Sequence, residues 1–190
     1  MRLLIVGPPG AGKGSQAVGL AQLLGVPAIS TGDLFRAHVR GETPLGLQVQ
    51  SIMAAGQYVP DSITNEMVRL RLEEADAREG FLLDGYPRTR DQVIELERML
   101  GERSLGLEGV IHLTVPTATL IARLAGRAAE EGRADDTPEA IRTRLEVYES
   151  LTAPILDVYR ERGVVHDIDG VGTREEVAAR VLAALGVRAG

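Results

Sequence analysis

Five apolar runs recur along the chain, and each is long enough for a strand. They cover residues 2–6, 27–30, 80–84, 109–115 and 164–168. The runs lack the alternation of apolar and polar residues typical of a half-exposed sheet, so they suit strands buried on both faces. Helical patterns separate them, which implies right-handed crossovers between parallel strands. The pattern predicts an α/β fold, a three-layer α/β/α sandwich around a five-stranded parallel sheet.

Two segments fit this core poorly. Residues 31–59 contain two short helical stretches, 33–40 and 44–55, between what would otherwise be neighbouring core elements. Residues 128–136 are polar, have no periodic apolar face, and lie between two helices that carry arginines. A charged stretch of this kind is most often a solvated loop. We interpret both segments as appendages above a ligand site at the edge of the core.

The composition narrows the class of protein. With 190 residues, 44% of them hydrophobic, the chain can bury one substantial core but is short for two, so we expect a single domain over residues 1–190. No apolar stretch approaches the roughly 20 residues of a membrane span, and the first strand begins too early for a signal peptide. We therefore expect a cytoplasmic monomer without a membrane partner.

Charge and cysteine content exclude further classes. The chain has no cysteine, which rules out disulfides, thiol catalysis and cysteine-based zinc sites. Its net charge of −6 argues against a nucleic-acid partner, because phosphate backbones call for a basic excess. Any site for anions must instead concentrate positive charge locally.

The sequence GPPGAGKGS, residues 7–15, stands between the first predicted strand and the first helical pattern. Its glycines let the backbone approach an anion, the dipole of the following helix attracts that anion, and Lys13 adds a full charge. Strand, glycine-rich loop and helix in this order are typical of a P-loop that binds nucleotide phosphates, and predict a fold of the P-loop NTPase type. The general motif continues with Ser or Thr as a Mg²⁺ ligand, whereas here Gly14 precedes Ser15, so direct metal ligation from this loop is not expected.

A second motif, DGYPRT at residues 84–89, follows the third predicted strand. Asp84 therefore lies at the carboxyl end of that strand, where open α/β sheets bind ligands. We interpret Asp84 as orienting Mg²⁺ through the water shell of the ion; the alternative is a cap of the following turn. Arg88 follows a stiff Tyr-Pro pair and presents a planar fork suited to a phosphate.

More cations gather in the C-terminal half. Arg123 and Arg127 share one helix face, Arg133 follows across a short loop, and Arg144 lies in the next helical pattern. Like charges four residues apart destabilise a helix unless an anion lies between them, although the pair could also simply complement the helix dipole. Asp136, followed by Thr-Pro-Glu, has the pattern of a helix N-cap.

The chain shows no arrangement for general-base catalysis. Phosphoryl transfer to a phosphate acceptor needs little covalent work from a protein, because the attacking oxygen is already ionised near neutral pH. No Ser-His-Asp or paired-carboxylate pattern is present, and we interpret His38, His112 and His166 as spectators.

Taken in order, these motifs resemble the adenylate kinases, a group of nucleoside monophosphate kinases. The segments that carry the resemblance are GPPGAGKGS, STGDLFR at 30–36, GQYVPD at 56–61, DGYPRT, Arg123 with Arg127, Arg133 with Asp135 and Asp136, and Arg144. The resemblance implies the Mg²⁺-dependent reaction ATP + AMP ⇌ 2 ADP, which maintains adenine nucleotide balance in nucleotide biosynthesis. It also implies a core of residues 1–29, 60–122 and 137–190, an NMP-binding segment at 30–59 and a lid at about 123–136.

The lid is of the short form. Only five residues separate Arg127 from Arg133, so the longer and sometimes zinc-bearing lid insertion of many bacterial relatives is absent. No structural zinc is expected, and Mg²⁺ bound with ATP is the one cofactor that the resemblance implies.

The same resemblance implies the roles of individual residues. Catalysis would involve Lys13, Asp84, Arg88, Arg127, Arg133 and Arg144. ATP would contact Gly10, Ala11, Gly12, Lys13, Gly14, Ser15, Arg123, Arg127 and Gly172. AMP would contact Thr31, Arg36, Gln57, Val59, Gly85, Arg88, Gln92, Arg133 and Arg144. Within these sets, Arg36 and Arg88 would hold the AMP phosphate, Thr31 and Gln92 would lie near its adenine, and Arg123 would stack on the ATP adenine.

Two alternatives stay open at this point. A UMP/CMP kinase would share the fold and the phosphate chemistry but read a pyrimidine, and a non-enzymatic P-loop module would bind a nucleotide without transferring phosphate. A P-loop GTPase is disfavoured because the chain lacks an Asn-Lys-x-Asp motif for reading guanine. On the preferred interpretation the partners are the small molecules ATP, AMP and ADP.

Overall fold

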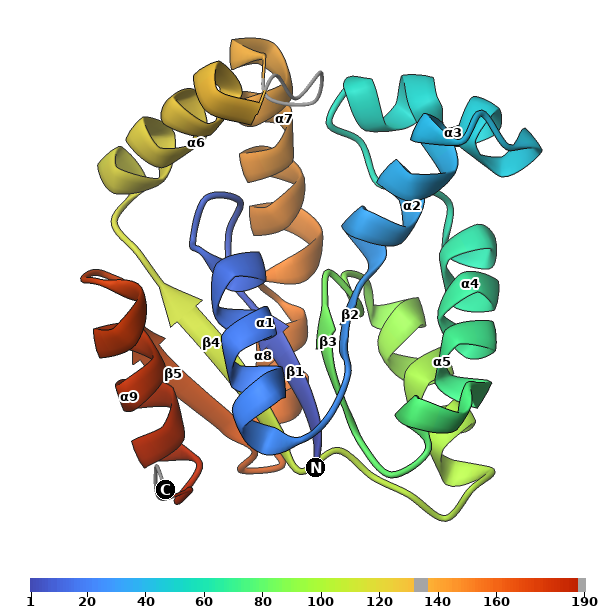
Figure 1. Cartoon of the computed structure of the whole chain (residues 1–190), viewed down its shortest axis with the longest axis vertical. Coiled ribbons are helices and arrows are strands. Elements are labelled where there is room, and N and C mark those ends of the chain that lie inside the picture. Colours follow the sequence, from blue (N-terminus) through green and yellow to red (C-terminus); the bar gives the residue numbers. More distant parts are fainter. Residues whose placement is uncertain (132–136, 188–190) are drawn as a thin grey trace.

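The computed structural model describes residues 1–131 and 137–187, without the side chains of residues 127–131. Its centre is a parallel sheet with the strand order β2-β3-β1-β4-β5 (Figure 1). The strands are β1 (Arg2–Val6), β2 (Ala28–Ser30), β3 (Phe81–Asp84), β4 (Gly109–Thr114) and β5 (Val165–Asp169). All five predicted strands are confirmed, and every boundary agrees within one residue.

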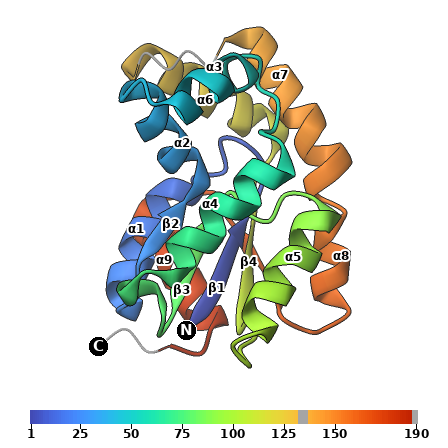
Figure 2. The ribbon, with the colours of Figure 1, turned by 90° about the vertical axis from the view of Figure 1, so that its right-hand side faces the viewer.

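Helices cover both faces of this sheet. They are α1 (Lys13–Leu24), α2 (Thr31–Arg40), α3 (Pro44–Ala54), α4 (Asp61–Glu73), α5 (Arg90–Gly101), α6 (Thr117–Glu131), α7 (Pro138–Val147), α8 (Ile155–Arg160) and α9 (Arg174–Ala184), with a 3₁₀ turn η1 (Ala75–Ala77) and a π-helical turn η2 (Tyr148–Thr152). Figure 2 shows α1 and α9 on one side of the sheet and α5 and α8 on the other. Within the part of the chain that the structure describes, no helix is both long and apolar enough to cross a membrane.

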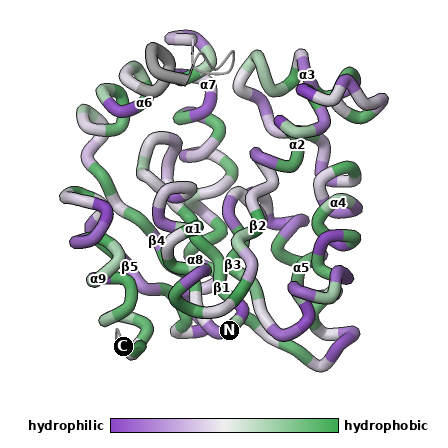
Figure 3. Tube along the Cα trace, in the orientation of Figure 1, coloured by the Kyte–Doolittle hydropathy of each residue, from purple (hydrophilic) through white to green (hydrophobic). Residues whose placement is uncertain are grey.

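Side-chain alternation along β1 explains the two apolar layers. Leu3 and Ile5 pack in one cluster with α1 and α9, whereas Leu4 and Val6 pack in the other with α4, α5 and α8. Successive side chains of a strand point to opposite faces, so a strand with two covered faces is apolar throughout. The apolar colour on β1 and β3 in Figure 3 marks this doubly buried centre, and it confirms the three-layer sandwich.

Two pairs of helices stand above the carboxyl ends of the strands, α2 with α3 and α6 with α7 (Figure 1). The first pair shares a small apolar cluster with the start of α4: Phe35, Val49 and Val59 are buried in it, and Ile63 and Met67 of α4 pack against them. The second pair meets the first near Gly56, where an added Cβ would lie 2.6 Å from the Ala140 carbonyl oxygen. Both appendages therefore border the edge of the sheet at which ligands of such folds bind.

Three predicted boundaries in the appendages need correction. α2 begins at Thr31 rather than residue 33, because the Ser30 hydroxyl accepts a hydrogen bond from the Asp33 N–H and caps the helix. α3 ends at Ala54, one residue earlier than expected. α6 continues to Glu131, so the first part of the expected loop at 128–136 is helical, and residues 132–136 lie outside the described residues.

Candidate functional site

The P-loop joins β1 to α1 and packs tightly against α6. Gly10 has φ +84°, and a Cβ there would lie 2.9 Å from the Leu120 carbonyl oxygen and 3.0 Å from the Leu124 side chain, so no larger residue fits. Among the described residues, no side chain caps α1 at Gly12. The first N–H groups of α1 are thereby left for an anion, which the helix dipole also attracts.

Lys13, the first residue of α1, turns back over this loop. Its Nζ donates to the carbonyl oxygens of Gly7 at 2.7 Å and Pro8 at 3.0 Å. These bonds hold the ammonium group against the loop backbone, where it adds positive charge to the N–H groups around it.

Asp84 ends β3 next to the P-loop. In the sheet register it lies opposite Ile5, and its Oδ2 is 3.7 Å from the position of a Cβ on Gly14. Burial raises the pKa of its carboxyl above the ordinary value, and the charges of Lys13 and Arg88 offset part of this effect. A buried carboxylate beside a phosphate-binding loop is the environment in which a bound cation would stabilise the ionised form.

A first cleft of about 570 Å³ lies between α2, α3 and the loop after β3. Its lining includes eight residues that the resemblance assigned to AMP, namely Thr31, Arg36, Gln57, Val59, Gly85, Arg88, Gln92 and Arg144. They come from five parts of the chain, and only the fold brings them together.

Arg88 enters this cleft under tight constraint. Its Nε donates to the Gly85 carbonyl oxygen at 2.7 Å, and its guanidinium carbon lies 4.7 Å from the ring centre of Tyr58. Gly85 has φ +82°, and a Cβ there would lie 2.7 Å from the Thr31 hydroxyl and 2.8 Å from Arg88 Nη2. Glycine is therefore required where the loop passes between the two side chains.

Thr31 and Gln92 line the cleft, but their side chains also form hydrogen bonds with neighbouring groups of the protein. The Thr31 hydroxyl donates to the Gly85 carbonyl oxygen at 2.9 Å. The Gln92 side chain accepts from the Arg88 N–H at 2.7 Å and donates to Asp61 at 2.6 Å. Both residues thus brace the loop that carries Arg88, and their proximity to an adenine stays a prediction.

A second, larger cleft of about 1400 Å³ runs along the P-loop. Its lining includes Gly10, Gly12, Lys13, Gly14, Ser15, Arg36, Asp84, Gly85, Arg88, Arg123, Arg144 and Arg174. Three arginines, Arg36, Arg88 and Arg144, line both clefts. Anions bound in the two clefts would therefore meet the same positive charges.

At the far end of this second cleft, Arg123 donates to the Gly170 carbonyl oxygen at 3.1 Å. Gly172 is not among the residues that line the cleft, and its contact with ATP stays a prediction. Ala11, also assigned to ATP, is buried and is not among the lining residues. Arg174, the first residue of α9, lines the cleft and was missed. Its position directly after the loop that follows the fifth strand was the available signal.

Several predicted residues belong to the second appendage. Arg127 lies in α6, and its side chain is outside the described part; Arg133, Asp135 and Asp136 lie outside the described residues altogether. The expected N-cap at Asp136 is wrong. The cap of α7 is Thr137, whose hydroxyl accepts from the Ala140 N–H at 3.2 Å. Serine, threonine and aspartate are all good caps, so the sequence pattern was consistent with either neighbour.

None of the three histidines is among the residues that line the two clefts. His112 is largely buried on β4, and its Nδ1 lies 2.6 Å from Asp167 Oδ1. The hydrogen bond with His112, aided by Arg160, holds the pKa of the Asp167 carboxyl below its ordinary value. This pair joins β4 to β5.

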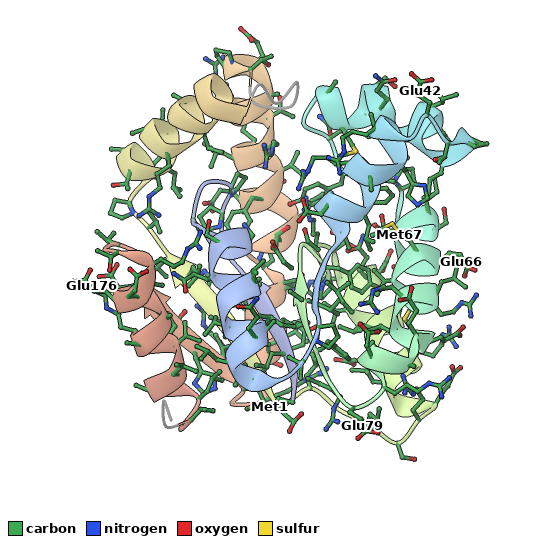
Figure 4. All side chains as sticks on the ribbon, viewed as in Figure 1. Met1, Glu42, Glu66, Met67, Glu79 and Glu176 are labelled. Atoms are coloured by element: carbon green, nitrogen blue, oxygen red, sulfur yellow. The ribbon has the colours of Figure 1, made fainter. Side chains whose placement is uncertain are left out.

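Positive charge is concentrated locally at the second cleft. Lys13 and five arginines line it beside Asp33 and Asp84, whereas Glu42, Glu66, Glu79 and Glu176 lie at the outer edge in Figure 4. The negative net charge is thus compatible with the local positive site that the sequence called for.

Comparisons with known proteins agree with this geometry. A profile of the adenylate kinase family matches residues 5–164. An adenylate kinase of Kocuria rhizophila is 54% identical over 184 residues, which cover 97% of this chain and 98% of the relative. One from Clavibacter michiganensis is 55% identical over 187 residues, covering 98% and 94%. Another, from Xylella fastidiosa, is 48% identical over 186 residues, covering 98% and 100%.

Proposed function

The chain belongs to the adenylate kinase family, and from this membership we propose how its two clefts divide the work of the reaction. The reaction is phosphoryl transfer, ATP + AMP ⇌ 2 ADP, and the protein is a nucleoside monophosphate kinase. In the proposal, AMP occupies the cleft between α2, α3 and Gly85, and ATP occupies the cleft along the P-loop. No observation favours a UMP/CMP kinase or a non-enzymatic module.

One observation carries this division: Arg36, Arg88 and Arg144 line both clefts. At such a junction the γ-phosphate of ATP and the phosphate of AMP would face each other across shared guanidinium groups. Their charges would allow two anions to approach, and they would stabilise the charge that spreads over the transferring group. The P-loop backbone and Lys13 would hold the β- and γ-phosphates. Arg123 would contact the adenine of ATP, and Arg127 and Arg133 would add charge from the lid.

Magnesium fits the donor set beside the P-loop. Asp84 offers a buried carboxylate, while Gly14 supplies no hydroxyl, so the carboxylate would hold the ion through its water shell. When bound, the ion would neutralise phosphate charge and hold ATP in one geometry. Lys13 and the arginines would orient the two phosphates and exclude water from between them.

The proposal extends to the organisation of the chain. We propose a core of residues 1–29, 60–122 and 137–190, an NMP-binding segment at 30–59 and a lid at about 123–136. The small apolar cluster of Phe35, Val49 and Val59 is distinct from the two clusters that flank the sheet, which supports an NMP-binding segment at 30–59. We also propose a cytoplasmic monomer without structural zinc, nucleic-acid or membrane partners. Size-exclusion chromatography coupled to light scattering tests the monomer.

Acceptor specificity tests the assignment of the first cleft. A coupled assay with ATP as donor and AMP, CMP, UMP or GMP as acceptor is expected to show a clear preference for AMP in kcat/KM. Turnover of UMP or CMP at the rate of AMP would contradict the proposal and favour the pyrimidine kinase. Binding of both nucleotides without turnover would favour the non-enzymatic module.

A further inference from the structure

Tyr58 stands at the end of segment 30–59, where the chain re-enters the core, and the reaction described above gives it no role. Its ring is partly buried and lines both the AMP cleft and a smaller cavity beneath Lys13. We propose that Tyr58 and Thr152 are positioning residues that hold Arg88 ready for the acceptor phosphate before AMP arrives. The inference rests on the proposed role of Arg88 as the arginine that holds that phosphate.

The ring of Tyr58 occupies one face of the Arg88 guanidinium, whose carbon lies 4.7 Å from the ring centre. A guanidinium attracts a ring through its face and binds phosphate through its edge, so the stack does not compete with the ligand. The Nε proton is already donated to Gly85. Within the described part of the chain, Arg88 makes no ion pair and its terminal Nη groups donate no hydrogen bond. Arg88 lines both clefts, so its terminal Nη groups are available to a phosphate there.

Thr152 fixes the other side of this arrangement. It lies in the π-helical turn η2, is only 4% exposed, and donates its hydroxyl proton to the Arg88 carbonyl oxygen at 3.0 Å. The Tyr58 hydroxyl lies 2.7 Å from the same threonine oxygen. Because threonine has one hydroxyl proton, Tyr58 must be the donor in this second bond. A directed chain therefore runs from the Tyr58 hydroxyl through Thr152 to the Arg88 backbone.

Together these contacts hold Arg88 at its backbone and at its guanidinium. The three residues are separated by 30 to 94 positions in sequence, and Tyr58 belongs to the segment that would carry AMP. An arginine side chain loses considerable rotamer freedom when it binds a ligand, and a stack that limits this freedom beforehand lowers the loss. The arrangement is thus expected to strengthen AMP binding while leaving ATP binding nearly unchanged.

The chain contains a matched control for this stack. Arg162 lies over the ring of Tyr159 at 5.7 Å, and the buried Tyr159 hydroxyl has no hydrogen-bond partner within the described part. Neither residue is among those that line the clefts. Tyr159→Phe therefore removes the same atom as Tyr58→Phe, in an Arg-Tyr stack away from the site.

The test measures KM for AMP, KM for ATP and kcat in Tyr58→Leu, Tyr58→Phe, Thr152→Val and Tyr159→Phe, with calorimetric binding of AMP alone. Tyr58→Leu removes the stack and is expected to raise KM for AMP about tenfold. Tyr58→Phe and Thr152→Val break the hydroxyl chain and are expected to raise it about threefold each. Both substitutions break the same chain of hydrogen bonds. The double variant Tyr58→Phe/Thr152→Val should therefore have the same KM for AMP as Thr152→Val alone, and not the product of the two increases. KM for ATP should stay within about twofold in every variant, and Tyr159→Phe should leave both KM values unchanged.

An equal rise of the two KM values, or an unchanged KM for AMP in Tyr58→Leu, would overturn the inference. If the increases in KM for AMP multiply in the double variant, the two residues do not act through one chain of hydrogen bonds. The conservative Tyr58→Phe and Thr152→Val variants keep the test decisive if Tyr58→Leu does not fold. Arg88→Ala, measured in parallel, separates the two claims. If it does not weaken AMP binding, the proposed function of Arg88 fails; if it does and Tyr58→Leu does not, only the positioning role fails.

Discussion

Lys13 is the only lysine in a chain whose other basic side chains, histidines apart, are all arginines. A flexible ammonium group is a point charge that can follow a moving phosphate, whereas a guanidinium recognises a phosphate edge in a fixed plane. In the structure the ammonium group and the guanidinium groups occupy different places. The lysine lies against the P-loop carbonyls, and arginines line the junction of the two clefts.

Replacement of Lys13 by methionine is expected to abolish turnover while leaving the fold intact. The side chain packs on a loop and not in the core, and its charge is worth most in the transition state, so kcat should fall on the order of 10³-fold or more. Arg162→Met, which removes one charge from the surface near Tyr159, is the matched control and should retain full activity. Retention of a large part of the wild-type kcat in Lys13→Met would refute the role of the lysine.

Asp84 is expected to destabilise the ligand-free protein at neutral pH. Its folded-state pKa is raised by burial, so the folded protein binds the proton more tightly than the unfolded chain, whose aspartates titrate near about 3.9. Ionisation therefore lowers stability as pH rises above that value, and the penalty vanishes below it. Asp84→Asn should raise Tm at pH 7, and the gain should shrink as the pH approaches 4.

Asp76 provides a control for the direction of this change in Tm. The hydrogen bond with Arg71 lowers the pKa of the exposed Asp76 carboxyl, so Asp76→Asn should lower Tm at pH 7 or leave it unchanged. A fall in Tm for Asp84→Asn would contradict the assigned cause. Asp84→Asn should also lose Mg²⁺-dependent activity, since an amide carries no charge to attract the cation.

At the scale of elements, the ends of the helices decide where functional side chains lie. α1 begins at Lys13 without a side-chain cap among the described residues, and α9 begins at Arg174 behind a full capping box of Thr173 and Glu176. The capping box occupies the first N–H groups of α9, whereas the first turn of α1 remains available to a phosphate.

The cap of α7 provides a direct test at this scale. Thr137→Ala removes the hydroxyl that accepts from the Ala140 N–H, which is expected to lower the free energy of unfolding by about 1 kcal/mol. Asp136→Ala is the matched control, because the adjacent aspartate is not the cap. Urea denaturation of the two variants measures the difference. A larger loss for Asp136→Ala would restore the capping role predicted from the sequence.

At the scale of the whole molecule, the two appendages share the ligand-binding edge of the sheet. Segment 31–59 contributes the buried residues of a small apolar cluster that α4 completes, and Gly56 lies against α7 at Ala140. Arg36 comes from the first appendage and Arg144 from the second, and both line the two clefts. Arg36 already pairs with Asp33 at 2.7 Å, and bound phosphates are expected to place further negative charge between the two arginines and so draw the appendages together.

A bisubstrate ligand, two adenosines joined by five phosphates, is expected to bind more tightly than ATP or AMP. It should also slow amide hydrogen exchange in segment 31–59 and in the second appendage, including residues 128–136, because elements with small cores open most easily and gain most from a ligand. ATP alone and AMP alone are the controls, and each should protect mainly its own cleft. Protection confined to residues 7–15 would rule out a concerted response of the two appendages.

Local patterns in the sequence were sufficient for much of this protein. A strand buried on both faces must be apolar, which explains why apolar runs place β1 and β3. β2 and β5 are only partly buried, so this reason does not extend to them, although their predicted positions are also confirmed. The P-loop needs glycines and a lysine in consecutive positions, so its chemistry is local as well. The carboxyl-end rule for parallel sheets then assigned Asp84 and Arg88 to the same edge. Family resemblance supplied the remaining AMP residues, and seven of them line one cleft together with Arg88.

Other features depend on contacts between distant parts of the chain. The choice of Thr137 over Asp136 as a cap rests on where α7 turns, since both residues have the required chemistry. Arg174 joins the second cleft because α9 packs beside α1, and Gly172 does not line that cleft although it lies two residues away. The hydroxyl chain from Tyr58 through Thr152 to Arg88 spans 94 positions. Sequence periodicity specifies which face of an element is buried, but only tertiary packing decides which side chains from separate elements meet there.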